Sequence, residues 1–437
     1  MRSSRASDRS RPRFAYSTAI ALGVVMAIMG QRPPAAHAQS DNPAPDWGAP
    51  YCGNQPRISA VYDNDVPTYQ RNDRTILYSG HDVKALCAMS YDGHSGYDYS
   101  RRIGTQACHS GTRQGIGARL AYAVADGIVR RSRWYQAEHE AGFGLHIDVR
   151  SDGGPGVGVV SHLYGHLAAV FVEEGASVSR GQAIGAVGTT GNSSGPHLHF
   201  QGTRSPHGDV SDLTFDPYGW NASFGSGYRY PGFSQPHRGD GWPMRALMPS
   251  QAGPPCPNDC GTVVIEESAP SVVYGCRAGI GLLRCPSWYL NDRGHGGSHR
   301  WTYPNGSSVD YWATYACPQC PSGTYRVEAY VPFGADIAST HVARYEAGSN
   351  VTILDQHEEG NEWHPIGIFR FTGMPAVTLS DRSDRYDYVA RSPQRVAADA
   401  LRFVQLCDDH AGTGNGQGQG QALGSNHGDD PAVLKVP

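Results

Sequence analysis

Short strand-like segments, separated by glycine and proline, run through this sequence and leave little room for long helices. The 437 residues include 55 Gly, 30 Pro and 24 Tyr, and only 17% of them are charged. Glycine and proline interrupt regular elements, whereas aromatic and β-branched residues favour strands. We therefore predict a mainly β protein with antiparallel sheets. A chain of this length is expected to hold about two or three domains.

The stretch SGPHLHFQ, at residues 194–201, contains two histidines one residue apart. Side chains alternate between the two faces of a strand, so His197 and His199 point the same way, and Leu198 and Phe200 point the other way. One face of this predicted strand is apolar, and the other carries two imidazoles that can bind a metal or transfer protons. Such a short motif also occurs by chance at a polar strand edge, which leaves both interpretations open here.

Other metal-ligating side chains precede this strand. The segment DGHSGYDYS places His94 and Asp98 four residues apart around a glycine, and SHLYGHLAAV places His162 and His166 in a strand-like stretch. His94, Asp98 and one histidine of the HLH pair would supply two imidazoles and a carboxylate. This set suits Zn²⁺ and leaves a fourth position for water. The remaining histidines would then act as acid, base or oxyanion partner.

The N-terminus has the form of a secretory signal peptide. Five arginines precede the apolar run AYSTAIALGVVMAIMG, and Ala36 and Ala38 occupy the positions of a cleavage site. We expect removal of residues 1–38, with cleavage near Ala38, and a secreted protein that is extracellular or periplasmic. No later stretch is apolar and long enough to cross a bilayer, so no stable membrane insertion of the mature form is expected. All ten cysteines follow the signal, which fits an oxidising compartment.

The charge balance argues against nucleic acid as a partner. Without residues 1–38 the chain has 30 Lys and Arg against 39 Asp and Glu, a net charge of −9, and no basic run. Binding to phosphates depends on Lys and Arg, so we expect no nucleic-acid partner. We expect the protein to be a monomer.

The chain closely resembles the LytM/lysostaphin-type zinc metallopeptidases, which cut peptide bonds in bacterial peptidoglycan. The resemblance covers about residues 76–203 and is carried by HSGYD, AYAVADGIV, GLHIDV and LYGHLAAVFVEEGASVSRGQAIGAVGTTGNSSGPHLHF. It implies the antiparallel LytM-type fold, a duplicated hybrid motif, and one zinc ion per chain. It also implies a zinc metalloendopeptidase that hydrolyses a cross-bridge or a stem peptide of peptidoglycan.

The resemblance assigns roles to five residues. The HxxxD motif of the family matches His94 and Asp98 as zinc ligands, and the second histidine of its HxH motif matches His199 as the third ligand. The catalytic histidines of the family match His166 and His197. His162 has no counterpart, and we interpret it as a histidine at the end of a strand.

Two departures from the family pattern limit what the resemblance implies. Gln201 stands where many relatives have a glutamate, and we interpret this position as supporting a ligand or the fold. The extra stretch RRIGTQACHSGTRQGIG, with Cys108 and His109, is expected to form a loop at the rim, tied to Cys87. The resemblance therefore implies the catalytic chemistry of the family more directly than its substrate specificity.

A second β-rich segment resembles the golvesin C-terminal-like module, which also ends xanthan lyases and is regarded as carbohydrate-binding-like. The match covers about residues 265–407 and rests on SGTYRVEAYVPFG, STHVARYEA, VTILDQHEEGNEWHPIGIFRF, AVTLSD and VAADALRFVQL. Alternating strands of this kind suit an antiparallel, jelly-roll-like β-sandwich. Sugar rings of a wall polymer or polysaccharide would stack on exposed aromatics, although tryptophans in small sandwiches are mostly core. The candidates are Trp288, Trp301, Trp312 and Trp363.

Composition divides the rest of the chain. The predicted segments are a signal peptide at 1–38, an irregular lead-in at 39–75, the peptidase domain at 76–235, a linker at 236–262, the β-sandwich at 263–409 and a disordered tail at 410–437. A chain that ends near Gln235 would retain every matched site residue.

The cysteines fall into two odd groups, three before residue 250 and seven after it, so full oxidation requires a bridge between the groups. Spacing favours pairing of Cys256 with Cys260, of Cys276 with Cys285, and of Cys317 with Cys320, which leaves Cys407 to pair with Cys52. The connectivity cannot be deduced from the sequence.

Two other functions remain open. One is a non-catalytic wall-binding or amidase-activating protein built on the same fold, although such relatives usually lose metal ligands, and all five matched residues are present here. The other is a secreted peptidase that acts on glycine-rich proteins.

Overall fold

The structure is a computed structural model. The described residues all belong to one compact unit, within Asn42–Pro437. The other unit, Met1–Asp41, with the predicted signal peptide, and the predicted tail at 410–437 lie outside the described residues. No helix in the described part of the chain is long and apolar enough to cross a membrane. The description covers residues 45–407 except 61, 63–93, 102–118, 136–140, 156, 206–212, 216, 218–246, 248–251, 278–287, 307, 333–338, 358–359 and 384–393.

The predicted fold class is confirmed. Pairings between the described strands are all antiparallel, and the described residues contain one 3₁₀ turn, His295–Gly297, but no α-helix. Glycines with positive φ mark many of the turns, as at Gly175, Gly181 and Gly191.

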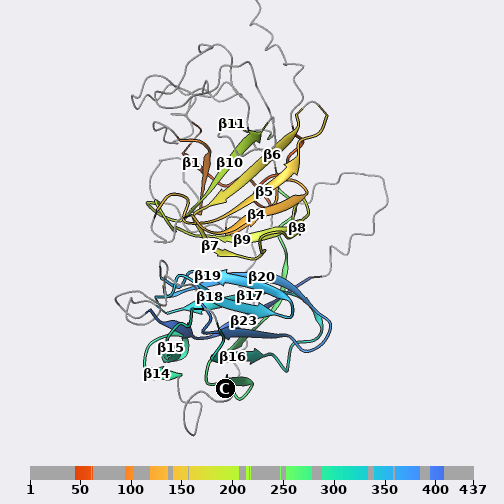
Figure 1. The fold of residues 1–437 in the computed structure, drawn as a ribbon. Coiled ribbons are helices and arrows are strands. Elements are labelled where there is room, and N and C mark those ends of the chain that lie inside the picture. The colour runs from red at the N-terminus through yellow and green to blue at the C-terminus, as the bar shows by residue number, and fades with distance from the viewer. Residues whose placement is uncertain are drawn as a thin grey trace, which may run out of the picture. The chain divides into compact units, whose positions relative to one another are not determined.

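A large antiparallel sheet forms the N-terminal module (Figure 1). Its strands run in the order β1, β2, β10, β6, β5, β4 and β8, and β11 pairs with the far end of β10. Their bounds are β1 Ile58–Ala60, β2 Tyr97–Ser100, β4 Gly127–Trp134, β5 Leu145–Asp152, β6 Val159–Gly165, β8 Ser177–Val178, β10 His197–Ser205 and β11 Leu213–Phe215.

Three short strands cover the apolar face of this sheet: β3 Leu120–Tyr122, β7 Leu167–Val170 and β9 Ala183–Val187. Ile147 and Val149 from β5 share one buried core with Leu167 and Ile184 from the covering strands. Leu198 and Phe200 belong to the same core, as the alternation in HLHF predicts. The histidines of that strand consequently face away from the core.

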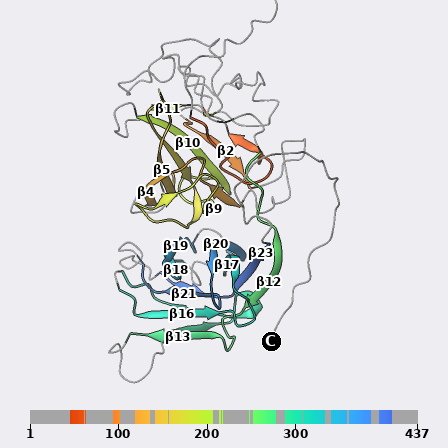
Figure 2. The same ribbon diagram turned by 90° about the vertical axis from the view of Figure 1, so that its right-hand side faces the viewer.

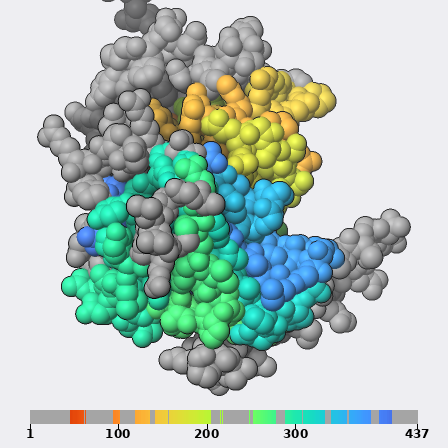
Figure 3. Space-filling model, turned by 60° about the horizontal axis from the view of Figure 1, so that its bottom comes forward, coloured from red at the N-terminus to blue at the C-terminus, as the bar shows by residue number. Residues whose placement is uncertain are grey.

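The C-terminal module consists of two facing sheets (Figure 2). Figure 3 shows part of the surface of this module in green to blue. Val327 and Phe403 on one sheet and Tyr315 and Leu379 on the other share a buried core, which makes the module a two-layer sandwich. The first sheet holds β12 Asp259–Ile265, β17 Gly323–Val331, β20 Glu362–Phe371 and β23 Leu401–Leu406.

The second sheet of the sandwich holds β13 Val272–Cys276, β16 Tyr311–Ala316, β18 Ala343–Ala347, β19 Asn350–Leu354 and β21 Ala376–Ser380. A separate three-stranded sheet contains β14 Tyr289–Asn291, β15 His299–Thr302 and β22 Val396–Ala398. β19 also pairs with β7 of the N-terminal module, with Ile353 opposite Val170 and Leu354 opposite Ala169. The two modules therefore share one continuous sheet.

One disulfide joins the early and late cysteines, as their odd numbers require: Cys52 pairs with Cys256. The predicted pairs Cys256–Cys260 and Cys52–Cys407 are both wrong, because Cys260 bonds to Cys407 and Cys256 bonds to Cys52. The reason is the register of β12 on β23, which places Asp259 opposite Leu406 and so brings the neighbouring cysteines together.

The local pair Cys317–Cys320 is confirmed. Cys276 is also disulfide-bonded, but its predicted partner Cys285 lies outside the described residues, as does the predicted pair of Cys87 with Cys108.

Candidate metal centre

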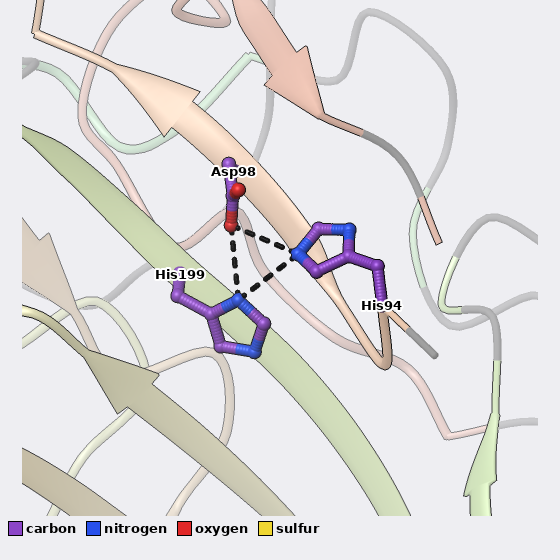
Figure 4. A group of neighbouring side chains, drawn as sticks. All are labelled: His94, Asp98 and His199. Atoms are coloured by element: carbon purple, nitrogen blue, oxygen red, sulfur yellow. Dashed lines mark hydrogen bonds and ion pairs between the residues drawn. The ribbon is translucent and has the colours of Figure 1, made fainter. Parts of the chain in front are cut away.

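Three predicted metal ligands lie together in the N-terminal module (Figure 4). His94 Nε2 is 3.1 Å from Asp98 Oδ1 and 3.3 Å from His199 Nδ1, and His199 Nδ1 is 2.9 Å from the same carboxylate oxygen. All three residues are buried. The sequence separates His94 from His199 by about a hundred positions, so only folding brings them into one cluster.

Strand pairing brings these side chains together. β2 pairs with β10 so that Asp98 lies directly opposite His199, and His94 belongs to the turn that leads into β2. Gly96 in that turn permits the close approach. A Cβ atom on Gly96 would lie 2.4 Å from the carbonyl oxygen of Phe200 and 2.8 Å from the ring of His199, which is too close for any side chain.

The geometry of the cluster suits zinc. Ligand atoms at about 2.0–2.1 Å from a tetrahedral zinc ion lie about 3.3 Å from one another, close to the separations seen here. Burial alone would raise the pKa of Asp98, but His94 and His199 lower it well below its ordinary value, so the carboxylate is ionised. Burial lowers the pKa of His199, which favours the neutral imidazole. Ionised carboxylate and neutral imidazole are the forms that bind metals.

Gln201 supports the cluster from the same face of β10. Its Oε1 atom accepts a hydrogen bond from the hydroxyl of Ser95 at 2.5 Å and lies 3.5 Å from His199 Nε2. A carbonyl oxygen at this place favours the tautomer of His199 that carries its proton on Nε2 and leaves Nδ1 free for a metal. The interpretation of Gln201 as a supporting residue agrees with this contact.

His166 lies beside the cluster in an uncommon backbone conformation. Its φ is 58°, a left-handed value that few residues other than glycine adopt and that is found preferentially at functional sites. Its Nδ1 donates a hydrogen bond to the carbonyl of Thr190 at 2.7 Å, which leaves Nε2 as the free ring nitrogen. Burial, assisted by His197 and His199, lowers the pKa of His166 to about 3. The free nitrogen is therefore unprotonated at neutral pH.

The ring of His197 is held by a backbone carbonyl, as that of His166 is. Its Nδ1 donates to the carbonyl of Gly195 at 2.7 Å, and its Nε2 lies 3.7 Å from Asp98 Oδ2. The rings of His166 and His197 are 4.7 Å apart between centroids, and the ring of His166 is 5.9 Å from that of His199. The structure thus brings all five predicted site residues into one group.

His162 does not belong to this group. It is fully buried on the core side of β6, where its ring nitrogens lie 2.8 Å from the hydroxyl of Ser151 and 2.9 Å from that of Tyr164. Its ring also packs edge-on against Trp47. Both ring nitrogens therefore have partners inside the fold, and His162 is a core residue.

The family comparison matches the same part of the chain. Residues 93–210 match Peptidase family M23. The chain is 33% identical over 108 residues to the DD-carboxypeptidase/endopeptidase Mpg of Neisseria meningitidis, a match that covers 25% of this chain and 19% of that protein. It is 53% identical over 38 residues to the peptidoglycan DD-endopeptidase ShyA of Vibrio cholerae, covering 9% of each. The aligned part thus spans about a fifth or less of these curated relatives.

Among solved structures, the catalytic domain of the antimicrobial peptidase lysostaphin from Staphylococcus simulans is similar at 22% identity, with 40% of this chain and 89% of that chain covered and a TM-score of 0.21. A xanthan lyase from Paenibacillus is similar at 12% identity, with 69% of this chain and 28% of that chain covered and a TM-score of 0.25.

Sequence reasoning missed one residue beside the group. Arg101 directly follows β2, is 5% exposed, and its backbone N–H donates to the carbonyl of Pro196, the residue before His197. No motif singles it out, because its other contacts come from strands far away in the sequence. Most of the predicted rim loop, with Cys108 and His109, lies outside the described residues.

The tryptophans proposed for sugar stacking differ from one another. Trp288 is buried at 6% exposure, so its prediction as an exposed aromatic is wrong; it packs against Tyr274 inside the sandwich. Trp301, Trp312 and Trp363 are partly exposed. Trp301 stacks on Tyr289 with 4.6 Å between ring centroids.

Proposed function

We propose that this protein is a secreted zinc metalloendopeptidase that hydrolyses peptide bonds in bacterial peptidoglycan, in a cross-bridge or a stem peptide. The observation that carries the proposal is the buried group of His94, Asp98 and His199 at zinc-ligand spacing, with two further histidines beside it. The match of residues 93–210 to Peptidase family M23 supports the reaction class. The names of the curated relatives support the substrate.

In this proposal His94 Nε2, Asp98 Oδ1 and His199 Nδ1 hold one Zn²⁺. Zinc with three protein ligands would polarise the scissile carbonyl and lower the pKa of a bound water towards about 7. Contacts with the two histidines keep Asp98 ionised, and burial favours the neutral form of His199, so both residues are in their metal-binding forms. Gly96 permits the turn with His94 to approach β10 closely enough.

The two remaining histidines handle protons and charge. Each donates its Nδ1 proton to a backbone carbonyl, which leaves Nε2 as the ring nitrogen that can take part in the reaction. The Nε2 of one ring would accept a proton from the attacking water. Once protonated, that ring would donate a hydrogen bond to an oxygen of the tetrahedral intermediate and then pass the proton to the nitrogen of the leaving amine. The carbonyls of Thr190 and Gly195 hold the rings in orientation, so little reorganisation accompanies the reaction.

The proposal includes secretion after cleavage near Ala38 and an accessory role for the C-terminal module, which resembles the golvesin C-terminal-like module. The disulfides support an oxidising location. Binding of the wall or of a polysaccharide is supported by one aromatic cluster, which consists of Tyr289 on β14, Trp301 on β15 and Tyr303 directly after β15. Tyr289 is 46% exposed and Tyr303 is 45% exposed.

Substitutions in the full-length protein separate metal binding from catalysis. His199→Ala should lose zinc and activity together, because it removes a ligand. His197→Ala should keep about one zinc per chain and lose roughly a hundredfold or more in turnover, the scale for removal of an acid–base or oxyanion group. Zinc content is measured by elemental analysis, and products released from purified peptidoglycan are identified by mass spectrometry, which also names the bond cut.

The controls distinguish the proposal from a non-catalytic wall-binding protein. Chelation of the metal should abolish hydrolysis, and zinc should restore it. Equal activity of the wild-type protein and the His197→Ala and His166→Ala variants would contradict the catalytic roles. Cleavage of glycine-rich proteins without any release from peptidoglycan would favour the alternative substrate.

A further inference from the structure

The backbones of both proposed catalytic histidines depend on one short segment, Val187–Gly188, at the end of β9. The N–H of Gly188 donates to the carbonyl of His166 at 3.0 Å, and the carbonyl of Gly188 accepts from the N–H of His197 at 3.1 Å. A shift of this segment would therefore move both histidines relative to the metal ligands.

Two arginines hold this segment from both sides. Arg101 Nη1 donates to the carbonyl of Val187 at 3.2 Å, and the N–H of Val187 donates to the carbonyl of Arg119 at 2.9 Å. The backbone N–H of Arg101 also donates to Pro196, next to His197, at 3.2 Å. Arg101 thus links the end of β2, which carries a metal ligand, to the end of β9 and the start of β10.

Both arginine side chains reach the beginning of β20 in the C-terminal module. Arg101 Nη2 donates to Glu362 Oε1 at 2.6 Å, and the two side chains are only 6% and 8% exposed. The guanidinium of Arg119 donates to the carbonyl of Trp363. Adjacent residues of one distant strand therefore anchor both arginines. The preceding residue, Asn361, is in a left-handed conformation, with φ of 57°, and its N–H donates to Val331.

A carboxylate is the appropriate anchor at this place. A buried guanidinium is stable only with charged or polar partners, and its rigid fork fixes two hydrogen-bond directions at once. When Glu362 holds Nη2, Nη1 is directed at the carbonyl of Val187. A neutral residue at 362 would weaken this anchor and allow the guanidinium to rotate away from Val187.

We propose that Glu362 is a positioning residue for the peptidase site: through Arg101 it fixes the Val187–Gly188 segment and hence the placement of His166 and His197. The C-terminal module is then part of the catalytic unit in addition to any role as a tether. The inference rests on the proposed function for its kinetic consequence, but its structural part can be tested without turnover.

The test compares full-length Glu362→Gln and Glu362→Asp with the wild-type protein on a soluble peptide substrate. Glu362→Gln should keep its zinc and a KM within about twofold of wild type, while kcat falls about tenfold or more, because small displacements of reacting groups can cost up to about a hundredfold. Glu362→Asp keeps the charge and should recover part of kcat. Metal content and thermal melting accompany both variants.

Asp259→Asn is the matched control. Asp259 accepts two hydrogen bonds from Arg326, at 2.7 and 2.8 Å, in the same sheet of the C-terminal module, but it has no contact with the Val187–Gly188 segment among the described residues. Its substitution should leave kcat unchanged. A loss of kcat in Asp259→Asn equal to that in Glu362→Gln would overturn the assignment, because it would indicate a general effect of weakening the module.

Amide hydrogen exchange provides a readout that needs no substrate. The amides of Gly188 and His197 should exchange faster in Glu362→Gln than in wild type, whereas that of Ile147 in the middle of β5 should not change. If Glu362→Gln left both kcat and the exchange of the two amides unchanged, the inference would be overturned, whether or not the melting temperature fell. If the wild-type protein cleaved no peptide at all, the proposed function would fail, and the exchange experiment would still decide the positioning role.

Discussion

The histidines of the N-terminal module differ in the partners of their ring nitrogens. His199 faces an ionised carboxylate and becomes a candidate ligand, whereas His166 and His197 each have Nδ1 bonded to a backbone carbonyl, and Nε2 of His197 lies 3.7 Å from Asp98. His162 has both nitrogens satisfied in the core, where burial lowers its pKa to about 3. In the proposed function, the imidazole side chain therefore has three roles, metal binding, proton transfer and core packing, and the partners of its two nitrogens distinguish them.

His162 should affect stability and its pH dependence without affecting catalysis. The folded protein keeps His162 neutral down to about pH 3, whereas the unfolded chain binds the proton below about 6.5. This stability contribution is present above pH 6.5 and is lost as the pH falls towards 3. In the metal-free protein, the free energy of unfolding should fall less between pH 7 and pH 4 in His162→Gln than in the wild type. The difference should be up to about 3 kcal/mol.

Denaturant unfolding at both pH values measures this effect, and activity at pH 7 should stay within about twofold of wild type. An unchanged pH dependence in His162→Gln would mean that the histidine is already protonated in the folded state.

The turn before β2, the strand β2 and the strand β10 each supply one residue of the candidate metal centre. The pairing of Asp98 with His199 sets the register, and the missing side chain of Gly96 allows the turn to lie against the backbone of Phe200. A register shift of one residue would turn the histidines into the core, and Leu198 and Phe200 outwards. Burial of Leu198 and Phe200 on one face of β10 therefore fixes the register that places His199 on the other face.

Gly96→Ala should damage the centre directly. Because the added methyl group would lie 2.4 Å from a backbone oxygen, the turn must move away from β10, and His94 must move with it. We expect zinc affinity to fall by about tenfold or more, the scale seen when ligand support is lost, and stability to fall by about 1–3 kcal/mol. Competition with a chromogenic chelator measures the affinity.

Gly261→Ala on β12 is the control, since an added Cβ there meets nothing within 4 Å. Equal zinc affinity in Gly96→Ala and wild type would show that the turn yields without moving His94.

At the scale of the whole molecule, three of the contacts between the sandwich and the N-terminal module bear on truncation of the chain. These are the pairing of β7 with β19, the disulfide of Cys52 with Cys256, and the buried ion pair of Arg101 with Glu362. Loss of one member of a buried ion pair is expected to cost about 3–5 kcal/mol. All three contacts would disappear in a chain that ends near residue 235, even though that chain contains all five site residues.

A protein truncated at residue 235 should consequently melt at a lower temperature and cleave even a short soluble peptide at least tenfold more slowly than the full chain. Thermal melting and peptide kinetics measure the two effects. If the aromatic cluster of Tyr289, Trp301 and Tyr303 also binds the wall, the loss on intact sacculi should exceed the loss on the peptide, because a tether raises local concentration. Full peptide activity of the truncated protein would contradict the structural role of the sandwich.

The sequence by itself determined the β class of the fold, the strand with His197 and His199, and the grouping of five site residues. The β class and the strand follow from composition and local alternation, whereas the grouping of the five residues follows from the resemblance of their motifs to the LytM/lysostaphin-type family. The bridge required by the odd cysteine groups also followed from counting.

Only the tertiary structure decided the contacts between distant strands. The pairing of Cys260 with Cys407, the burial of His162 and the ion pair of Arg101 with Glu362 depend on which strands meet and in which register. Arg101 and Glu362 are 261 positions apart, and nothing near either residue indicates the other. Such contacts arise because burial of apolar faces determines which strands are neighbours. The charged side chains at the strand ends pair where the register places them close together.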